Sequence, residues 1–402
     1  MSNVHIIGIG ADGAEGLHPR LLKRIEESQL LVGGERQLSF FPDFTGEKLV
    51  IGGNLKEIKK RVQDEEDPVV VLASGDPLFY GIGAYLSGSM EAVIEPQPSS
   101  IQLAFARMNE SWHNAKTISV HGRPITGLAQ KIDGEEKVAL LTDEINSPDM
   151  IARYLLRFNM TEYDAFVAEN IGAPDERCRH LSLEEMSEAS FAPLNVVILK
   201  KNRPFKTWTA GIPDEEFSQR KPDKGLITKR DIRILTIGRM NIHRDSTVWD
   251  IGTCTGSIAI EAAKIARNGA VFAIEKNEAD LANAEANFQK FRADITLIHG
   301  KAPDGLEAFP DPDCVFMGGT AGNMDRLIDT CAKRLKPGGT IVLNAVTIEN
   351  MSKAHQLFRE AGFEVDMALA QVSLSRPILN MTRLEAQNPV YIICAKRKEE
   401  QS

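Results

Sequence analysis

The sequence predicts an α/β protein made of two domains. Its 402 residues exceed one ordinary domain of roughly 100–200 residues. Short β-branched runs alternate with helical patterns along both halves, and this alternation is typical of sheets covered by helices. Residues 202–213, NRPFKTWTAGIP, hold two prolines and no clear period. We therefore place the boundary there and expect domains at residues 1–205 and 206–402, each folding on its own.

The first domain is expected to contain seven strands. They are short apolar and β-branched runs separated by helical patterns such as the amphipathic segment at residues 147–158. In chain order, the expected strands are residues 5–10, 69–77, 91–100, 116–124, 137–143, 164–172 and 195–201.

The second domain is expected to open with a helix and to continue with seven further strands. The helix is expected at residues 228–239, with Thr228 as its N-cap. The strands are expected at residues 247–252, 270–277, 295–303, 313–319, 338–346, 362–375 and 388–397.

Composition narrows the class of protein. The net charge of -9 argues against a general nucleic-acid binder, because phosphate contacts need a basic face. The five cysteines are scattered without a C-x-x-C spacing, which predicts reduced thiols and neither disulfides nor a structural metal site. No apolar run reaches about 18 residues and no secretory signal pattern opens the chain, so a cytoplasmic location without a membrane partner is expected.

The segment VWDIGTCTGSIAIEAA, residues 248–263, predicts a nucleotide-cofactor turn. A buried strand ends in Gly252–Gly256 and a helix follows, so backbone N–H groups at the helix N-terminus face a ligand. A dinucleotide fingerprint would require G-x-G-x-x-G, but Cys254 and Ser257 occupy two of its glycine positions. The next strand ends at Glu275, whose carboxylate can accept both hydroxyls of a ribose. An adenosine cofactor without pyrophosphate is favoured, and the alternative is an ordinary turn with a surface glutamate.

Further motifs of the second half resemble class I S-adenosylmethionine (SAM) methyltransferases. They are PDEEF, GLITKRDIR, AIEKN, FMGGT, LKPGG, LNAVTIEN and RLEAQNPV, and they look most like the C15-type decarboxylating precorrin methyltransferases of cobalamin synthesis. The resemblance implies a seven-stranded Rossmann-like sheet. Cys254 stands where glycine is commoner, and we expect its small side chain to point away from the cofactor. The implied SAM-binding residues are Thr228, Gly252, Thr253, Cys254, Thr255, Gly256, Glu275 and Ala302.

Motifs of the first half resemble a different SAM-dependent family, the two-lobed tetrapyrrole methylases of class III. In order they are GIGADG, ASGDPLFYGIG, PSSIQLAFARMN, SVHGRP, LLTD and PLNVVIL. The resemblance implies SAM between the lobes and a GIGADG loop facing the substrate through Gly8 and Gly10, although both glycines also suit a simple tight turn. Two SAM sites per chain follow. The implied SAM-binding residues here are Gly75, Asp76, Pro77, Ser99, Ser100, Thr142 and Asn195.

Few side chains are candidates for chemistry beyond binding. Methyl transfer from a sulfonium depends chiefly on positioning, so the sequence assigns no catalytic acid or base with certainty. His121 is the candidate base, and its simpler role is that of a hydrogen-bonded structural histidine. Arg123 suits the carboxylates of a tetrapyrrole, because guanidinium binds carboxylate with two parallel bonds. Arg376 and Arg383 are further candidates, unless they are only solvated surface residues.

Together the two resemblances imply a bifunctional enzyme similar to the decarboxylating precorrin-6B (precorrin-6Y) C5,15-methyltransferases. The first domain would methylate carbon 5, and the second would methylate carbon 15 and remove the ring C acetate carboxyl. Precorrin-6B or precorrin-7, or a cobalt form, would thus become precorrin-8. A homo-oligomer is expected because relatives assemble. The alternatives are a first half that only binds and delivers the tetrapyrrole, methylation of RNA or protein by the same folds, and a dehydrogenase.

Overall fold

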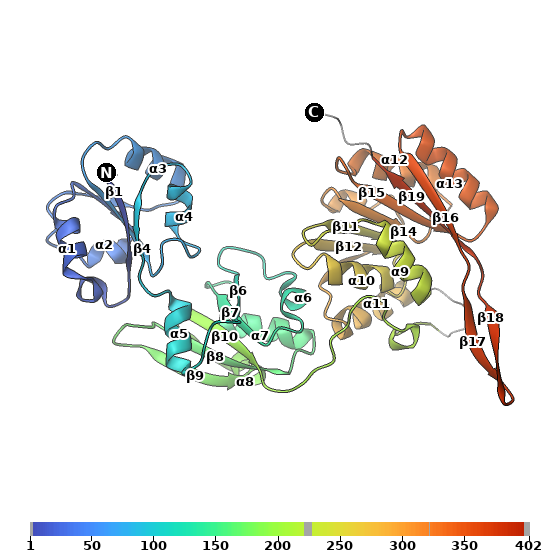
Figure 1. Cartoon of the computed structure of the whole chain (residues 1–402), viewed down its shortest axis with the longest axis horizontal. Coiled ribbons are helices and arrows are strands. Elements are labelled where there is room, and N and C mark those ends of the chain that lie inside the picture. Colours follow the sequence, from blue (N-terminus) through green and yellow to red (C-terminus); the bar gives the residue numbers. More distant parts are fainter. Residues whose placement is uncertain (1–2, 221–226, 321, 398–402) are drawn as a thin grey trace. The chain divides into compact units, whose positions relative to one another are not determined.

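Separate sets of strands divide the chain into two units (Figure 1). The computed structural model describes residues 3–220, 227–320 and 322–397. The first unit holds the chain up to Pro124, Glu135–Tyr154 and Thr161–Pro204. The second holds Ile125–Gly134, Leu155–Met160 and the chain from Phe205 onward. The first two residues of the motif GLITKRDIR, at positions 225 and 226, lie outside the described residues.

The first lobe of the first unit is a parallel five-stranded sheet. Its strand order is β3-β2-β4-β1-β5. Buried Ile, Val and Leu side chains cover both faces, as expected for parallel strands between helices. The strands are β1 (Val4–Ile9), β2 (Leu30–Gly33), β3 (Glu47–Val50), β4 (Val69–Ser74) and β5 (Val93–Glu95), and the helices are α1 (Pro19–Glu26), α2 (Glu35–Ser39), α3 (Leu55–Gln63) and α4 (Ile82–Ser87).

The second lobe is a mixed five-stranded sheet in the order β6-β7-β10-β8-β9. Helix α5 packs Ile101 and Phe105 against Phe166 and Ile198 of this sheet. The strands are β6 (Lys116–Ser119), β7 (Lys137–Leu141), β8 (Tyr163–Glu169), β9 (Arg177–Ser182) and β10 (Asn195–Lys201), with α5 (Ser100–Met108), α7 (Pro148–Arg157) and α8 (Leu183–Glu188). Strands β2, β3 and β9 are additions to the seven that the sequence indicates, because β2 and β3 are short and β9 is polar.

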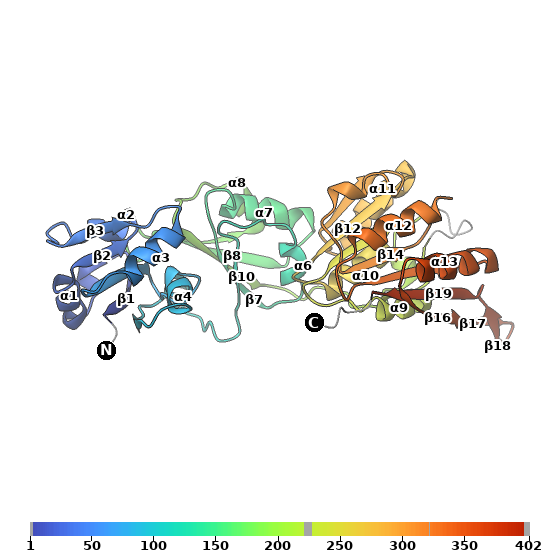
Figure 2. The same ribbon diagram turned by 90° about the horizontal axis from the view of Figure 1, so that it is seen from above.

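The second unit is built on a seven-stranded sheet in the order β13-β12-β11-β14-β15-β19-β16. Strand β19 runs antiparallel to β15 and β16, and the other neighbouring pairs in this sheet are parallel. Helices α9, α10 and α11 cover one face and α12 and α13 the other (Figure 2). The strands are β11 (Thr247–Ile251), β12 (Ala270–Glu275), β13 (Ile295–His299), β14 (Cys314–Met317), β15 (Thr340–Ala345), β16 (Glu364–Ala370) and β19 (Val390–Lys396), and the helices are α9 (Arg230–Arg239), α10 (Ser257–Ile265), α11 (Glu278–Lys290), α12 (Met324–Arg334) and α13 (Ile348–Glu360).

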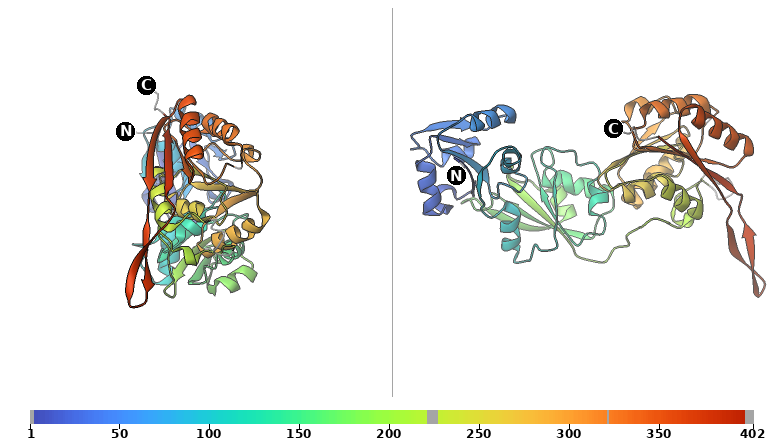
Figure 3. Two further views of the ribbon diagram at one scale, coloured as in Figure 1. Left: turned by 90° about the vertical axis from the view of Figure 1, so that its right-hand side faces the viewer. Right: turned by 45° about the horizontal axis from the view of Figure 1, so that its top comes forward.

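A two-stranded ribbon extends from this unit (Figure 3). It consists of β17 (Ser373–Ile378) and β18 (Met381–Ala386), which pair with each other in an antiparallel manner. The sequence predicts one strand over residues 362–375, but the structure ends β16 at Ala370 and starts β17 at Ser373. The second strand of the ribbon was missed because its side chains are all exposed, so it lacks the apolar alternation of a half-buried strand.

Two short segments of the first half belong to the second unit. Ile125–Gly134 carries α6 (Leu128–Ile132), after which Asp133 pairs with Lys264 at 2.8 Å and with Arg292 at 3.1 Å. These side chains are almost completely buried, where an unpaired charge would be costly. Burial lowers the pKa of Lys264, and the charge of Asp133 works against that shift. A division of the chain at residue 205 would separate Asp133 from both cations.

Among the residues that the structure describes, no helix is long and apolar enough to cross a membrane.

Candidate active sites

The site of the second unit is organised by the turn between β11 and α10. Gly252, Cys254 and Gly256 have φ values of 74°, 48° and 77°, so the chain turns sharply at the end of the buried strand. A Cβ at Gly256 would lie 2.3 Å from the ring of Phe288, which makes glycine necessary there. Cys254 bears a left-handed conformation that costs a non-glycine residue about 1–2 kcal/mol, which explains why glycine suits this position.

Glu275 fixes the turn from the end of the neighbouring strand β12. Its Oε2 accepts a hydrogen bond from the N–H of Cys254 at 3.0 Å, and its Oε1 accepts one from the N–H of Asn277 at 2.9 Å. The side chain is almost buried, yet it lines the cavity at this edge of the sheet. The turn and the acid are therefore held in one geometry by direct hydrogen bonds.

A cavity of about 820 Å³ opens over the turn. Cys254 lines it, although the sequence predicts that its side chain points away from the cofactor. Thr255 and Gly256 lie behind the lining, at the start of α10. Of the residues with an implied SAM-binding role, those that line the cavity are Thr228, Gly252, Thr253, Cys254, Glu275 and Ala302.

Asp250 is a cavity residue that the sequence analysis did not single out. Its Oδ2 accepts hydrogen bonds from the Thr253 hydroxyl at 2.6 Å and from the Ala259 N–H at 3.0 Å, while Oδ1 is buried without a partner. Burial raises the pKa of this carboxyl to about 7, against the lowering effect of the two hydrogen bonds. The sequence did contain an indication of this residue, namely an acid inside the buried strand VWDI. Burial of a carboxyl group costs free energy, so its presence in such a strand indicates a role.

Polar side chains of two kinds border the same cavity. Lysines and an arginine stand at its rim, and Arg220 is paired with Asp280 through Nε and Oδ1 at 2.7 Å. Carboxamides lie in β15, at the start of α13 and just before β19, on the side of the cavity away from Glu275. These amides lie in the motifs LNAVTIEN and RLEAQNPV, whose sequence alone predicts no role for them. The cations are Arg220, Lys229, Lys276 and Lys301, and the carboxamides are Asn344, Asn350, Gln387 and Asn388.

The structure does not bring Arg376 and Arg383 to this cavity. They face each other across the ribbon and both pair with Glu385, at 3.0 Å and 3.4 Å. Both guanidinium groups are largely exposed. Their predicted contact with substrate would require the substrate to reach the ribbon.

The first unit has its own cavity, of about 910 Å³, where the strand ends of its two lobes meet. Pro77 and Thr142 lie outside the lining, and the Thr142 hydroxyl donates to Asn195 Oδ1 at 2.6 Å. Gly8 also lies outside, and a Cβ there would come within 2.0 Å of the carbonyl oxygen of Gly75. The implied cofactor and substrate residues that line the cavity are Gly10, Gly75, Asp76, Ser99, Ser100 and Asn195.

The turn containing His121 is held rigidly at the edge of this cavity. His121 lines the cavity, and its Nδ1 lies 2.9 Å from the carbonyl oxygen of Thr142, so Nδ1 carries the proton. The Asn146 amide donates to the carbonyl oxygens of Val120 and Arg123 at 2.7 Å and 2.9 Å. The guanidinium of Arg123 lies 5.9 Å from the ring centroid of Tyr80, and that ring lines the cavity. His121 is thus placed with Nε2 available to a ligand.

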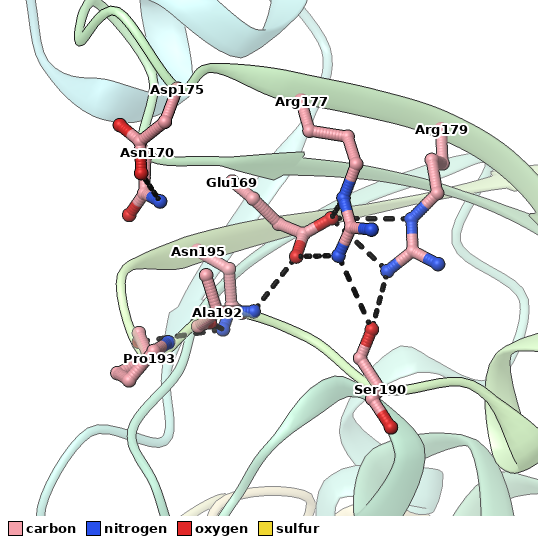
Figure 4. A network of polar contacts seen from close by, with 9 residues as sticks. All are labelled: Glu169, Asn170, Asp175, Arg177, Arg179, Ser190, Ala192, Pro193 and Asn195. Atoms are coloured by element: carbon pink, nitrogen blue, oxygen red, sulfur yellow. Dashed lines mark hydrogen bonds and ion pairs between the residues drawn. The ribbon is translucent and has the colours of Figure 1, made fainter.

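An ionic network around the buried carboxylate of Glu169 holds the loop before β10 (Figure 4). Glu169, 1% exposed, accepts hydrogen bonds from Arg177 at 2.7 Å and from the N–H of Ala192 at 2.8 Å, and it pairs with Arg179 at 3.0 Å. Burial acts to raise the pKa of Glu169, but these bonds and charges outweigh it and lower the pKa. The network fixes the loop that leads to Asn195 in the cavity wall.

The fold and turn of the second unit define a class I SAM-dependent methyltransferase: a seven-stranded sheet with one antiparallel strand, a glycine turn after β11 and an acid ending β12. The family model for the precorrin methyltransferase domain matches residues 221–397, and the model for tetrapyrrole (corrin/porphyrin) methylases matches residues 3–187. The chain belongs to the family of decarboxylating precorrin-6Y C(5,15)-methyltransferases. It is therefore a SAM-dependent methyltransferase.

Two curated relatives are similar to this chain over 96% of its length. A precorrin-6Y C(5,15)-methyltransferase [decarboxylating] of Sinorhizobium sp is 31% identical, over 96% of this chain and 94% of the relative. Its namesake in Mycobacterium tuberculosis is 28% identical over 96% of this chain and 97% of the relative. A solved structure of a precorrin-6Y C5,15-methyltransferase from Geobacter metallireducens is 39% identical, with a TM-score of 0.45, over 46% of this chain and 98% of that one.

Replacing Asp250 by Asn is expected to flatten the dependence of stability on pH. Folding favours the neutral acid, since burial raises its pKa from 3.8 to about 7. The wild type should therefore lose stability as the pH rises from about 4 through 7, by on the order of a few kcal/mol. The amide stays neutral and should show no such loss. Denaturant unfolding without cofactor at pH 5 and pH 8, followed by tryptophan fluorescence, measures the difference. Glu285→Gln on the exposed face of α11 is the control, and equal pH slopes for wild type and Asp250→Asn would refute the assignment.

Proposed function

We propose that the chain carries both activities in the name of its family. The first unit methylates carbon 5 of precorrin-6B or its cobalt form, and the second methylates carbon 15 and removes the ring C acetate carboxyl. The observation that carries this proposal is a cavity at the strand ends of each unit, in a chain similar along 96% of its length to a C(5,15) enzyme. The alternative, a first half that only delivers the tetrapyrrole, is not favoured.

The proposed chemistry requires mainly that two molecules be held in line. A sulfonium methyl group and the accepting ring carbon react by displacement, and near-attack positioning accounts for about 7–11 kcal/mol of barrier lowering. In the first cavity, Nε2 of His121 is proposed to take the proton that the methylated carbon loses. Arg123, beside the ring of Tyr80, is proposed to hold a substrate carboxylate.

We propose two SAM sites, one in each cavity. Calorimetry of the full-length protein with S-adenosylhomocysteine (SAH) is expected to give a stoichiometry near two. Glu275→Ala removes the ribose acceptor and a bond to the turn, so it should weaken one site by about 1–3 kcal/mol and leave the other unchanged. Glu278→Ala, an exposed change in the next turn of chain, is the control. A stoichiometry of one that does not respond to Glu275→Ala would exclude a cofactor site at the second turn.

The two reactions are expected to respond to different variants. Gly10→Leu places a side chain in the first cavity, where the nearest atoms to a new Cβ belong to the flexible side chain of Asp12. This variant should lose methylation at carbon 5 while still releasing carbon dioxide from a substrate already methylated there. Glu275→Ala at limiting SAM should lose carbon dioxide release while still methylating carbon 5. Product mass, with the acetate carboxyl isotopically labelled, decides between them. Loss of carbon dioxide release in Gly10→Leu with that substrate would contradict the division.

We propose that the ribbon joins copies of this chain. An isolated two-stranded ribbon is marginal in water, and this one exposes Leu379 (93%) in its turn and Met381 (67%) and Leu384 (73%) in β18. Burial of these apolar side chains against the same ribbon of another copy would stabilise both. Light scattering of Leu379→Lys combined with Leu384→Lys should give a smaller mass than the wild type. Ile145→Lys, an exposed position outside the ribbon, is the control. An unchanged mass would refute the ribbon as the contact.

A further inference from the structure

The carboxamides of the second cavity form one wall of it, and neither cofactor binding nor the rim cations explain their presence there. Asn344 lies in β15, Asn350 follows in α13, and Gln387 and Asn388 precede β19. Strands β15 and β19 lie on the opposite side of β11 from β12. This carboxamide wall is therefore on the other side of the cavity from Glu275 and the turn after β11. Lys229 is the one cation among the described lining residues of this side, and its Nζ lies 3.9 Å from Asp214.

Two of these amides have unused hydrogen-bonding capacity. The Thr236 hydroxyl donates to the carbonyl oxygen of Ile232 at 2.8 Å, so it can only accept from Asn344, whose Nδ2 lies 2.9 Å away. One N–H of the Asn344 amide is then left for a ligand. Gln387 is anchored through its backbone N–H, which donates to Val372 at 2.8 Å, but its Oε1 is buried without a partner among the described residues. Rotation of the amide can present an N–H at the same place.

Decarboxylation explains why neutral donors suit this wall. The bond between the acetate CH2 and its carboxyl carbon breaks, and carbon dioxide leaves. The released electron pair enters the conjugated ring, and a ring electron pair forms the new bond to the sulfonium methyl, so the cofactor leaves as a neutral thioether. The exocyclic methylene becomes a methyl group by a proton shift within the ring system. One carboxylate and one sulfonium are thereby converted into two neutral molecules.

The charge on the carboxylate falls as this reaction proceeds. A lysine or arginine paired with that carboxylate would stabilise the starting state more than the transition state, and would slow the reaction. Neutral N–H donors orient the carboxylate with a weaker dependence on its charge. A cavity that binds a polycarboxylate would otherwise be expected to use cations on every side, as it does at the rim.

We propose that the carboxamide wall, with Asn344 and Gln387 at its centre, holds the acetate carboxylate that is lost as carbon dioxide. This inference rests on the proposed function of the second unit. The neutral wall would decide which carboxylate of the substrate is lost. The carboxylate held by the carboxamides leaves as carbon dioxide, and the carboxylates bound by the rim cations are retained.

The test adds a charge to the wall of the full-length protein. Gln387→Lys is expected to leave the KM for the C5-methylated precorrin equal or lower and to reduce the rate of carbon dioxide release at least tenfold. Gln387→Glu, which repels the carboxylate, is expected to raise the KM at least tenfold. Gln371→Lys is the matched control, since Gln371 is exposed and lies outside the cavity lining. Affinity for SAH should be unchanged in all three, which shows that the cofactor side is intact.

The results distinguish a failure of the proposed function from a failure of the proposed role of the carboxamide wall. A wild-type protein that binds SAH but releases no carbon dioxide would overturn the proposed function. If the wild type is active and Gln387→Lys and Gln387→Glu both behave like Gln371→Lys, the carboxamide wall does not hold the acetate. Faster carbon dioxide release by Gln387→Lys would overturn the role of neutrality. If Gln387→Lys loses SAH binding, the KM of Gln387→Glu is the deciding measurement: a rise of at least tenfold supports the proposal, and an unchanged KM overturns it.

Discussion

The turn at the end of β11 is the constraint on which the second site depends. The strand is buried and hydrogen-bonded to β12 and β14, and α10 must pack its apolar face on the same sheet. Five residues are left to reverse the chain, which requires left-handed backbone at Gly252, Cys254 and Gly256. Within the turn, the N–H groups of Gly252 and Thr253 donate to the carbonyl oxygen of Ile274, and Glu275 accepts the N–H of Cys254. The geometry of the turn and the packing of the hydrophobic core are thus fixed by the same few residues.

The first unit reaches a comparable cavity by a different route. Its sheet strands end against a second lobe, so the cavity is closed by loops from both lobes and by no single turn. Loops carry few apolar contacts of their own, and here polar networks position them. Glu169 holds the loop before Asn195, and Asn146 holds the turn of His121. Loss of the Glu169 carboxylate or of the Asn146 amide would leave its buried partners unpaired. The free-energy cost of an unpaired buried group exceeds the stabilisation that one hydrogen bond provides.

The charges around the second cavity are unevenly distributed. Carboxyl groups lie beside the turn, as Asp250, Glu275 and Asp280, while cations stand at the rim and amides form the far wall. An acidic turn suits a sulfonium cofactor, since opposite charges attract more strongly away from bulk water. The rim suits a polycarboxylate. The uncharged wall is the part that electrostatic attraction to substrate does not explain, and for this reason it indicates a chemical role.

The sequence alone determined the α/β class, the two sets of strands and the glycine turn after β11. These features are local: Gly252 and Gly256 are needed by the backbone of one short turn, and β-branched runs report burial on both faces of a strand. Family likeness pointed to Thr228 and Gly75, because each lies in a contiguous motif. The exposed strand β18 and the short strands β2 and β3 gave no such pattern.

Only the tertiary structure decided which distant side chains meet. Arg383 and Gln387 are four positions apart, yet one lies on an exposed ribbon and the other lines the cavity. Asp133 precedes the predicted boundary and completes an ion cluster with Lys264 and Arg292 of the second unit. The isolated Oδ1 of Asp250 and Oε1 of Gln387 are visible only once their surroundings are known. Burial and hydrogen-bond satisfaction depend on all the atoms around a group, and these come from segments whose proximity no local pattern encodes.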